Sequence, residues 1–371
     1  MSEPEPKRLR RCWAEIDLAA VRHNFDAIQK QAGEGVGVMV VVKANAYGHG
    51  LPIVVRALAS RAAMFGVANV AEAREVRKHA PDVPVFVLGP ALPEERAEIV
   101  GSGFIPSISN AEEARAYAAE GAGKVPVHLV LDTGMGRIGI WQDDALAVIK
   151  EIVAIPGLEI AGIASHLPVA DEDEAFTHEQ LQRFHRLAGE IAALGIQRPV
   201  VHVENSAGFI VEPGFAGTMV RAGLALYGSA PLASFQSQIR PVMTWKTRVT
   251  LVREVGAGRG VSYGRTFITP HPMRIATLAA GYADGYRRHL GNRGAAVLIG
   301  GQRCALLGRV TMDQILVDVS ALPECQAGDE AVLIGLQGSE EITALELAEK
   351  AGTIAWDVFT GIGERVERVP R

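Results

Sequence analysis

Residues 40–50 read Val40-Val41-Val42-Lys43-Ala44-Asn45-Ala46-Tyr47-Gly48-His49-Gly50. The apolar and β-branched residues from Val36 to Val42 predict a strand that is buried on both faces. This strand should end at Lys43, and a turn of small residues leads to a helical pattern from Leu51. Burial at a strand end lowers the pKa of an amine and makes it nucleophilic, which suits a Schiff-base lysine. Alternatively, Lys43 only caps the strand and extends its amine into water.

The alternation of strand and helix patterns continues along the chain from this strand. The strand candidates are 36–42, 64–70, 85–88, 104–108, 125–131, 158–164, 199–203 and 219–222. A helix-length segment separates each strand from the next, except between the last two, which implies parallel strands with right-handed crossovers. Eight such units in roughly 200 residues predict a (β/α)8 TIM-type barrel. A doubly wound open sheet is the second candidate, but no G-x-G-x-x-G motif follows the first strand.

A change of pattern after Pro231 predicts a second domain. Polar and β-branched residues alternate over 244–252, and Gly- and Pro-rich turns recur from there to Gly328. Short strands at this spacing are typical of an all-β domain, with one helical segment near 344–351. A strand candidate at Cys12 to Leu18 lies outside the barrel series. We predict a barrel domain over 12–236 and a C-terminal, mostly-β domain over 237–371.

The composition describes a globular protein with an ample core. Of 371 residues, 48% are hydrophobic and 21% are charged, and the net charge is -5. This charge gives no electrostatic case for nucleic acid or an anionic membrane as a partner. Three widely spaced cysteines favour a reducing compartment over a disulfide framework or a metal site. Because 1–11 is polar and no apolar run reaches the length of a membrane span, we expect a cytoplasmic protein.

Polar residues lie near the carboxyl ends of five of the predicted strands, within the strand or just after it, where a barrel places its active site. They are Lys43, Arg137, His166, His202, Asn205, Ser206 and Arg221. The loops after the last two strands, near Ser206 and Gly223-Leu224, suit a phosphate group. A nucleophilic lysine, a phosphate cradle and a partner for a ring nitrogen describe a pyridoxal phosphate site. Taken singly, Arg137 could be a surface ion pair, His166 a rim residue and Ser206 a helix cap.

These motifs resemble the alanine racemase family, the fold-type III pyridoxal phosphate enzymes, from about residue 11 to the C-terminus. The matching segments are 41–50, 132–139, His166, 205–207, 221–228, 262–264, 281–285 and 308–313. The resemblance implies that Lys43 holds the cofactor and transfers a proton on one face of the substrate Cα. Tyr263 would do so on the opposite face. Because an unperturbed tyrosine has a pKa near 10, it would need nearby positive charge or a proton shuttle.

The resemblance also implies roles for the remaining motif residues. Arg221 would face the pyridine nitrogen, with His202 orienting it and His166 packing on the ring. A permanently charged arginine gives up no proton readily, which should disfavour transamination. Tyr47 and Ser206, with the backbone of Gly223 and Leu224, would hold the phosphate. Arg137 and the backbone of Met312 would hold the substrate carboxylate. Tyr282 and Tyr286 would narrow the entrance to the site, and Asp313 would lie beside this entrance.

Three positions depart from the family pattern. Val130 stands where many members have a lysine, often carbamylated, so Arg137 lacks that anionic neighbour. Glu204 occupies a position that is usually small. The chain stops at Pro370-Arg371, without the tyrosine that often closes the last strand.

Two other functions compete with racemisation on the same barrel. A pyridoxal phosphate decarboxylase would generally place an acid on the pyridine nitrogen, and Arg221 argues against it. A non-catalytic cofactor-binding protein would lack the second domain and Tyr263. The resemblance therefore favours interconversion of L-alanine and D-alanine, a peptidoglycan precursor. It also implies a homodimer, in which the β domain of each chain completes the active site of the other.

Overall fold

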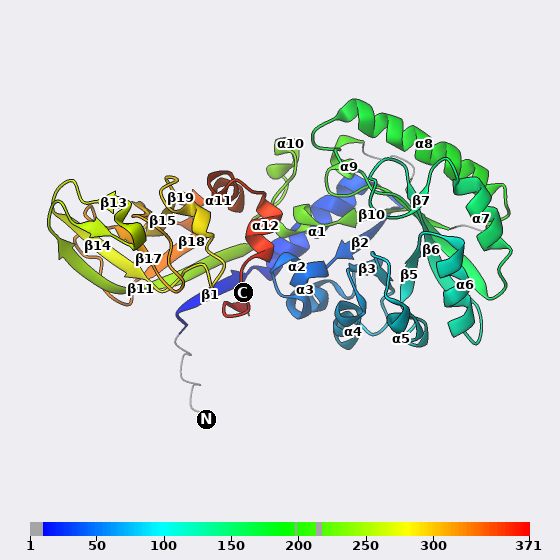
Figure 1. Cartoon of the computed structure of the whole chain (residues 1–371), viewed down its shortest axis with the longest axis horizontal. Helices are drawn as coiled ribbons and strands as arrows, with labels where there is room; N and C mark the ends of the chain where they lie inside the picture. Colours follow the sequence, from blue (N-terminus) through cyan, green and yellow to red (C-terminus); the bar gives the residue numbers. More distant parts are fainter. Residues whose placement is uncertain (1–9, 197–198, 213–216) are drawn as a thin grey trace, which may run out of the picture. The chain divides into compact units, whose positions relative to one another are not determined.

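The computed structural model describes residues 10–196, 199–212 and 217–371. Two compact units are present. One is Ala19–Arg240, and the other joins the described residues up to Leu18 with Pro241–Arg371. Figure 1 labels the elements of each unit. Among the described residues, no helix is both long enough and apolar enough to cross a membrane.

The unit Ala19–Arg240 contains the predicted barrel of parallel strands. In spatial order the strands run β10-β2-β3-β4-β5-β6-β8-β9. Their bounds are β2 (Gly37–Val41), β3 (Met64–Val67), β4 (Val85–Val87), β5 (Ile105–Ile108), β6 (Val125–Asp132), β8 (Leu158–Ala164), β9 (Val200–His202) and β10 (Met219–Ala222). The amide of Thr218 donates to the carbonyl of Val201 at 2.9 Å, and that of Arg221 donates to Glu204 at 2.9 Å. These bonds nearly close the ring between β9 and β10, so the barrel prediction is confirmed.

Helices surround this barrel (Figure 1). They are α1 (Leu18–Ala32), α3 (Leu51–Leu58), α4 (Val70–His79), α5 (Arg96–Gly101), α6 (Ala111–Glu120), α7 (Ala145–Val153) and α8 (Glu174–Ala192). Several begin where an Asn or Asp side chain accepts a backbone N–H of the first turn, as Asn69, Asn110 and Asp173 do. Shorter pieces are η1 (Pro93–Glu95), β7 (Ile140–Trp141), α9 (Gly208–Val211), η2 (Leu224–Tyr227) and α10 (Ala233–Gln236).

Inside the barrel, apolar side chains from neighbouring strands pack together. Met39, Met64, Phe86 and Met219 form one buried cluster that joins β2, β3, β4 and β10. Val38, Val40 and Val42 are also buried, so the strand before Lys43 is covered on both faces, as its composition predicts. The strand itself ends at Val41, one residue before the predicted end at Val42.

The other unit is built on a sheet in the order β16-β15-β18-β11-β1-β20. Its strands are β1 (Cys12–Ile16), β11 (Met243–Val255), β12 (Gly260–Val261), β13 (Phe267–Ile268), β14 (Met273–Leu278), β15 (Ala296–Ile299), β16 (Gln302–Ala305), β17 (Ile315–Asp318), β18 (Glu330–Gln337), β19 (Glu340–Ile342) and β20 (Glu367–Pro370). Its helical pieces are η3 (Tyr263–Arg265), η4 (Arg288–Leu290), α11 (Ala344–Ala351) and α12 (Ala355–Thr360). This is the mostly-β domain predicted from the turn spacing.

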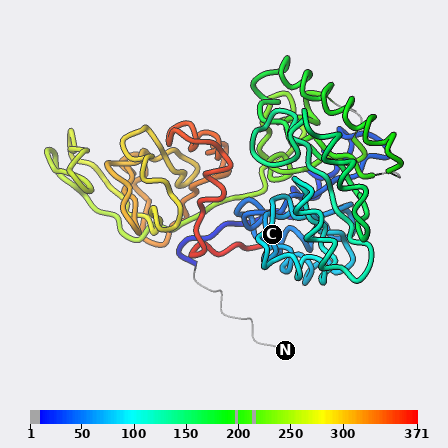
Figure 2. Tube along the Cα trace, turned by 45° about the vertical axis from the view of Figure 1, so that its right-hand side comes forward, coloured from blue at the N-terminus to red at the C-terminus, as the bar shows by residue number. Residues whose placement is uncertain are grey.

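The strand β1 joins this second sheet although it precedes the barrel in the chain. It pairs with β11 in antiparallel and with β20 in parallel orientation, so the first and last strands of the described chain lie in one sheet (Figure 2). The sequence-based boundaries, 12–236 and 237–371, grouped β1 with the barrel. The backbone hydrogen bonds of β1 tie it to the other unit instead, because its partner strands lie there.

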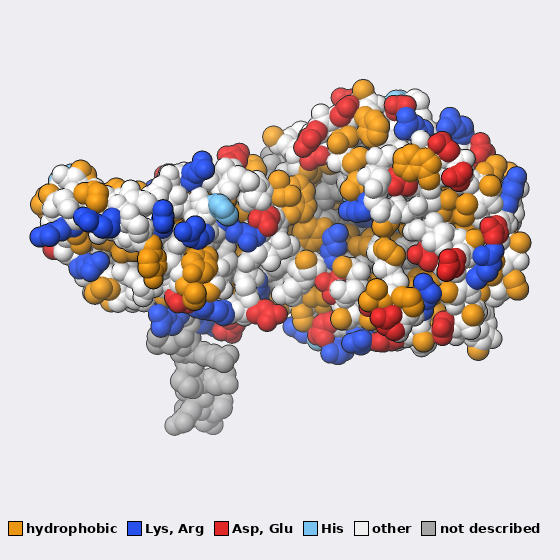
Figure 3. Space-filling model, viewed as in Figure 1, with side chains coloured by type: hydrophobic (Ala, Val, Ile, Leu, Met, Phe, Trp, Pro, Cys, Tyr) orange, Lys and Arg blue, Asp and Glu red, His pale blue; other side chains and the backbone are white. Residues whose placement is uncertain are grey.

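Charges of both signs are interspersed over the surface that is visible in Figure 3. This distribution accords with a net charge of only -5 over the chain. Among the described residues, no group of three or more His, Cys, Asp or Glu side chains is arranged to hold a metal ion.

Candidate active site

Lys43 stands at the start of a turn with an unusual backbone. The turn is α2 (Lys43–Tyr47), and its last four residues all have positive φ, at 52° for Ala44, 54° for Asn45 and Ala46, and 52° for Tyr47. Residues with a Cβ atom adopt this left-handed conformation at a cost of about 1–2 kcal/mol each. The expected turn of small residues is therefore a left-handed helical turn, which places Lys43 and Tyr47 at its two ends.

The Lys43 amine lies in a setting that favours its neutral form. The side chain is partly buried, and burial is the main cause that lowers the lysine pKa. The positive charges of Arg137 and Arg221 lower this pKa further, while the carboxylate of Glu72 opposes them. The nucleophilic character predicted for Lys43 thus has a physical basis in its surroundings.

Tyr47, Ser206 and Gly223 meet at the ends of β2, β9 and β10. The hydroxyl oxygen of Ser206 accepts hydrogen bonds from the amides of Gly223 at 3.2 Å and Ala225 at 3.4 Å. A Cβ atom on Gly223 would lie 2.8 Å from the Tyr47 hydroxyl and 3.8 Å from the Ser206 hydroxyl. Burial raises the pKa of Tyr47 to about 12, so its hydroxyl stays protonated and can donate. Hydroxyl and amide donors around a glycine form a cradle that suits a phosphate.

The ring of Tyr47 is held in place by packing. It stacks on Tyr227, with ring centroids 5.0 Å apart, and Tyr227 donates to the carbonyl of Val41 at 2.8 Å. The cradle is therefore anchored to the end of strand β2. Sequence reasoning identified Tyr47 but not Tyr227, which reads as an ordinary core aromatic.

Arg221 is buried on β10 and fixed by five acceptors. One terminal nitrogen donates to Nδ1 of His202 at 2.9 Å and to its carbonyl at 2.7 Å. The other donates to the carbonyls of Ser165 at 2.7 Å and Val203 at 2.8 Å, and to Nδ1 of His166 at 3.0 Å. Burial lowers the pKa of Arg221 to about 10, so the guanidinium remains charged at neutral pH. The expected contact of His202 with Arg221 is present, and His166, which was expected only to pack on the cofactor ring, contacts the same guanidinium.

The guanidinium also determines the tautomers of a buried histidine pair. Because Arg221 donates to Nδ1 of His202, a neutral His202 carries its proton on Nε2. That nitrogen lies 2.9 Å from Nδ1 of His128, so His128 accepts and carries its own proton on Nε2. Burial lowers the pKa of His202 well below its usual value and that of His128 to about 4, which keeps both rings neutral.

His128 escaped the sequence analysis. It lies in the apolar run of β6, where a lone histidine resembles any core residue. Its ring packs against Phe86 and over Gly162, where a Cβ atom would lie 2.5 Å from the imidazole. A glycine in the neighbouring strand β8 was the only local sign that a ring needs this space.

Arg137 lies in the loop after β6, which Asp132 folds back on itself. The two carboxylate oxygens of Asp132 accept the amides of Gly134 and Gly136 at 3.0 Å and of Arg137 at 3.1 Å. The Arg137 side chain is exposed, and no described residue accepts a hydrogen bond from its guanidinium. Val130 is buried beneath this loop and offers no charge.

In the second unit, the residues expected at the substrate are largely at the surface. Tyr263 is 71% exposed at the start of η3, and Met312 is 53% exposed. The amide of Tyr282 donates to Thr311 at 3.0 Å, which brings the exposed Tyr282 beside the Met312 loop. Lys43 and Tyr263 thus belong to different units.

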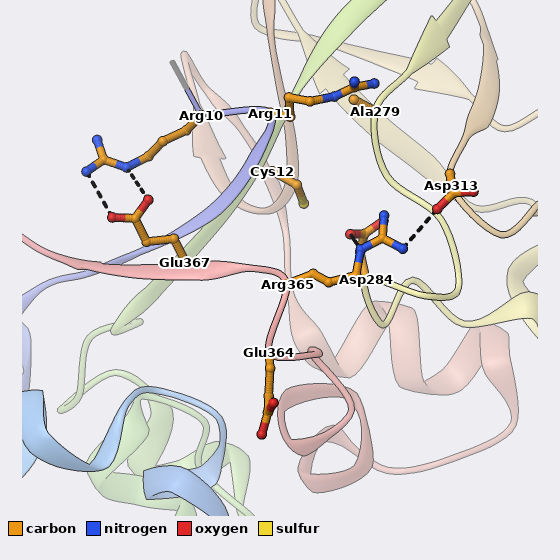
Figure 4. Close-up of a pocket in the computed structure, with 9 residues that line it drawn as sticks. All are labelled: Arg10, Arg11, Cys12, Ala279, Asp284, Asp313, Glu364, Arg365 and Glu367. Carbon is orange, nitrogen blue, oxygen red and sulfur yellow. Dashed lines mark hydrogen bonds and ion pairs between the residues drawn. The ribbon is translucent and has the colours of Figure 1, made fainter. Parts of the chain in front are cut away.

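Two other residues of this unit differ in their surroundings. Tyr286 was expected at an entrance, but it is fully buried and packs against Trp245 with ring centroids 6.0 Å apart. The backbone turns tightly before it, where the amide of Tyr286 donates to the carbonyl of Gly281 at 3.1 Å, and the side chain lies in the core. Asp313 is exposed and pairs with Arg365 at 2.9 Å, beside a pocket that Asp284 also lines (Figure 4).

Comparison with known proteins covers both units. The alanine racemase N-terminal domain family matches residues 16–231, and the alanine racemase C-terminal domain family matches 242–370. An alanine racemase of Halothermothrix orenii is 40% identical over 370 residues, which are 98% of this chain and 97% of the relative.

Solved structures agree with these matches. The alanine racemase of Clostridium difficile 630 superimposes with a TM-score of 0.92 at 31% identity, covering 98% of this chain and 97% of that one. The enzyme of Bartonella henselae, solved with covalently bound pyridoxal phosphate, has a TM-score of 0.89 at 28% identity and covers 98% and 100%. The chain belongs to the alanine racemase family, whose members are pyridoxal-phosphate-dependent isomerases.

Proposed function

We propose that this chain interconverts L-alanine and D-alanine with pyridoxal phosphate, by proton transfer on both faces of the substrate Cα. The observation that carries the proposal is the buried Arg221 network. Five acceptors occupy the two terminal nitrogens, and no described residue accepts a hydrogen bond from Nε. A charged donor held in this way suits a pyridine nitrogen and gives up no proton readily.

The residues around Gly223 fit the phosphate of this cofactor. The cradle has room for an anion only because residue 223 lacks a Cβ atom, and the Tyr47 and Ser206 hydroxyls point into the same space. Leu224 opens the 3-10 turn η2 directly after it and adds a backbone N–H. Lys43 would hold the other end of the cofactor, and the His166 ring, kept neutral by its lowered pKa, would pack against it.

When bound, pyridoxal phosphate withdraws electrons from the substrate and acidifies its Cα–H bond. Lys43 then removes or returns the proton on one face, and Tyr263 acts on the other. Two bases are needed because racemisation takes the proton from one face and delivers it to the opposite one. Because Arg221 keeps its proton, it does not protonate the pyridine nitrogen. This favours return of the substrate proton to Cα.

The substrate carboxylate would be held from two sides. Arg137 offers a guanidinium with no partner among the described residues, and the Met312 loop offers a backbone N–H. Tyr282, beside Met312, would limit the side chain to the size of a methyl group. Asp313 would not contact the substrate itself, because its carboxylate is paired with Arg365.

The exposure of Tyr263 and Met312 supports a homodimer with shared sites. Large side chains that are more than half exposed are typical of a surface that another surface covers. In a symmetric dimer, the β unit of each chain can complete the barrel site of the other. We place the reaction in the cytoplasm, where it would supply D-alanine for peptidoglycan or consume it.

The test is incubation of the purified chain and pyridoxal phosphate with L-alanine in D₂O. A racemase exchanges the α-hydrogen for deuterium and loses optical rotation, both of which NMR and polarimetry follow. Release of CO₂ without racemisation would instead identify a decarboxylase. Binding of the cofactor with neither change would leave only a cofactor-binding protein.

A further inference from the structure

The left-handed turn after strand β2 depends on a bond from outside itself. The first N–H groups of a single helical turn have no acceptor within the turn. In α2, Ala46 donates to Val42 at 2.8 Å and Gly48 donates to Ala44 at 2.9 Å. The amide of Ala44 instead donates to Oε1 of Glu72, at 2.7 Å. Glu72 lies in the first turn of α4, in the next βα unit of the barrel.

Glu72 uses its second oxygen for an ordinary helix cap. Its Oε2 accepts the amide of Ala68 at 2.8 Å, while Asn69 accepts the amide of Glu72 at 3.0 Å. This reciprocal pair is a capping box shifted by one residue, because the carboxylate accepts the amide of Ala68, which precedes the N-cap Asn69. One carboxylate thus connects the start of α4 with the turn that carries Lys43.

The chain contains a matched capping box without this connection. At the start of α6, the amide of Ser109 donates to Oε2 of Glu113 at 2.8 Å, and Asn110 accepts the amide of Glu113 at 2.8 Å. No hydrogen bond to Oε1 of Glu113 is present among the described residues. The bond to Ala44 is therefore the feature that distinguishes Glu72 from Glu113.

We propose that Glu72 is a positioning residue, which fixes the peptide between Lys43 and Ala44 and so aims the Lys43 amine and the Tyr47 hydroxyl. The Ala44 N–H that donates to Glu72 belongs to the same peptide group as the Lys43 carbonyl. The orientation of this peptide therefore sets the direction in which the Lys43 side chain leaves the backbone. Tyr47 lies three residues after Ala44 in the same left-handed turn. This inference rests on the proposed function, because it gives Lys43 and Tyr47 their purpose.

The Glu72 carboxylate also acts on Lys43 by its charge. Arg137 and Arg221 lower the pKa of the Lys43 amine, and Glu72 is the one anion that raises it in return among the described residues. Removal of Glu72 should therefore lower this pKa further. A helix cap that served stability alone would leave the pKa of Lys43 unchanged.

The test compares Glu72→Ala, Glu72→Gln and the control Glu113→Ala with the wild-type full chain. Without added pyridoxal phosphate, each chain is pulse-labelled with acetic anhydride across a pH series, and mass spectrometry gives the labelled fraction of Lys43. In a second measurement, pyridoxal phosphate is titrated into each chain and binding is followed by absorbance. Both alanine variants lose one capping box, so thermal unfolding should report a similar loss of stability.

We expect Glu72→Ala to lower the pH midpoint of Lys43 labelling by about half a unit or more and to weaken cofactor binding about tenfold. Glu113→Ala should leave both unchanged. Glu72→Gln, which keeps an acceptor oxygen, should shift the midpoint in the same direction and guards against an alanine variant that fails to fold.

Equal midpoints and affinities for Glu72→Ala and Glu113→Ala would overturn the proposal, as would cofactor binding by Glu72→Gln as weak as that by Glu72→Ala, because the glutamine keeps the acceptor oxygen for the Ala44 amide. Failure of the proposed function is a different result. In that case the wild-type chain itself would bind no cofactor or leave L-alanine unchanged, while the labelling comparison would still report on Glu72 and Lys43.

Discussion

A Cβ atom added to Gly223 would lie 2.8 Å from the hydroxyl oxygen of Tyr47, inside the contact distance of carbon and oxygen. Gly223→Ala should therefore displace the Tyr47 ring or fill the cradle, and weaken pyridoxal phosphate binding about tenfold or more. Binding is measured by titration of the absorbance of the cofactor. Gly189→Ala is the control, because a Cβ atom there meets nothing within 4 Å on α8. Equal affinities of the two variants would place the phosphate elsewhere.

The pair formed by His128 and His202 predicts a difference between two substitutions. His128→Leu removes the acceptor of the buried His202 Nε2–H, which should cost about 1–3 kcal/mol of unfolding free energy. His128→Asn can still offer an oxygen near the position of Nδ1 and should lose less. Urea unfolding measures both costs, and ¹⁵N NMR of the imidazole rings reports the His202 tautomer. The assignment would be wrong if His202 in the wild type carried its proton on Nδ1.

The buried carboxyl of Glu204 predicts a pH dependence of stability. Burial raises its pKa to about 7 from an ordinary 4.5, although the charge of Arg221 opposes the shift. Between these two values the folded chain holds a proton that the unfolded chain releases, so stability should fall as pH rises from about 4.5 through 7. The total loss is on the order of 1–3 kcal/mol.

Glu204→Gln keeps the shape and removes the titration, so this decline should disappear and the variant should be more stable than the wild type at pH 8. Denaturant unfolding at pH 5, 6, 7 and 8 makes the comparison. Parallel pH profiles of the two proteins would mean that Glu204 is ionised in the fold throughout this range.

Shared active sites predict recovery of activity from two defective chains. Lys43→Ala and Tyr263→Phe should each be nearly inactive alone, because each dimer lacks one of its two bases at every site. After mixing under conditions that exchange subunits, about half the dimers are hybrids with one intact site of two, so about a quarter of the wild-type activity should return. Racemase assays before and after exchange measure it. A mixture that stays inactive would place Lys43 and Tyr263 of one chain at the same site.

The barrel was predictable because its signal is repeated eight times along the chain. Parallel strands put their carboxyl ends at one rim, so the position of Arg221 and Ser206 after separate strands was enough to group them. The left-handed turn at 44–47 was not predictable, since Ala and Tyr rarely adopt positive φ, and Asn, which does so more readily, visits it as a single residue and not in a run of four. The place of β1 in the second sheet depends on pairing with strands more than 200 residues away, which local patterns do not encode.

Side-chain burial was the least predictable property of the site. Tyr286 lies only four residues after the exposed Tyr282, and the tight turn between them, which local sequence patterns do not specify, leaves one ring at the surface and the other in the core. His128 was not identified from the sequence, because a lone histidine in an apolar strand resembles a core residue, yet it is hydrogen-bonded to His202 and through it to Arg221.

The left-handed turn at 44–47 also has a consequence for the order of folding. A peptide that contains only strand β2 and this turn should not adopt it, because four unfavourable residues outweigh the few hydrogen bonds within the turn. The segment can settle only after the following strand and helix have docked and brought Glu72 into reach. We therefore expect the reactive lysine to acquire its final orientation late in folding, so that a partly assembled barrel presents an ordinary surface amine rather than a nucleophile.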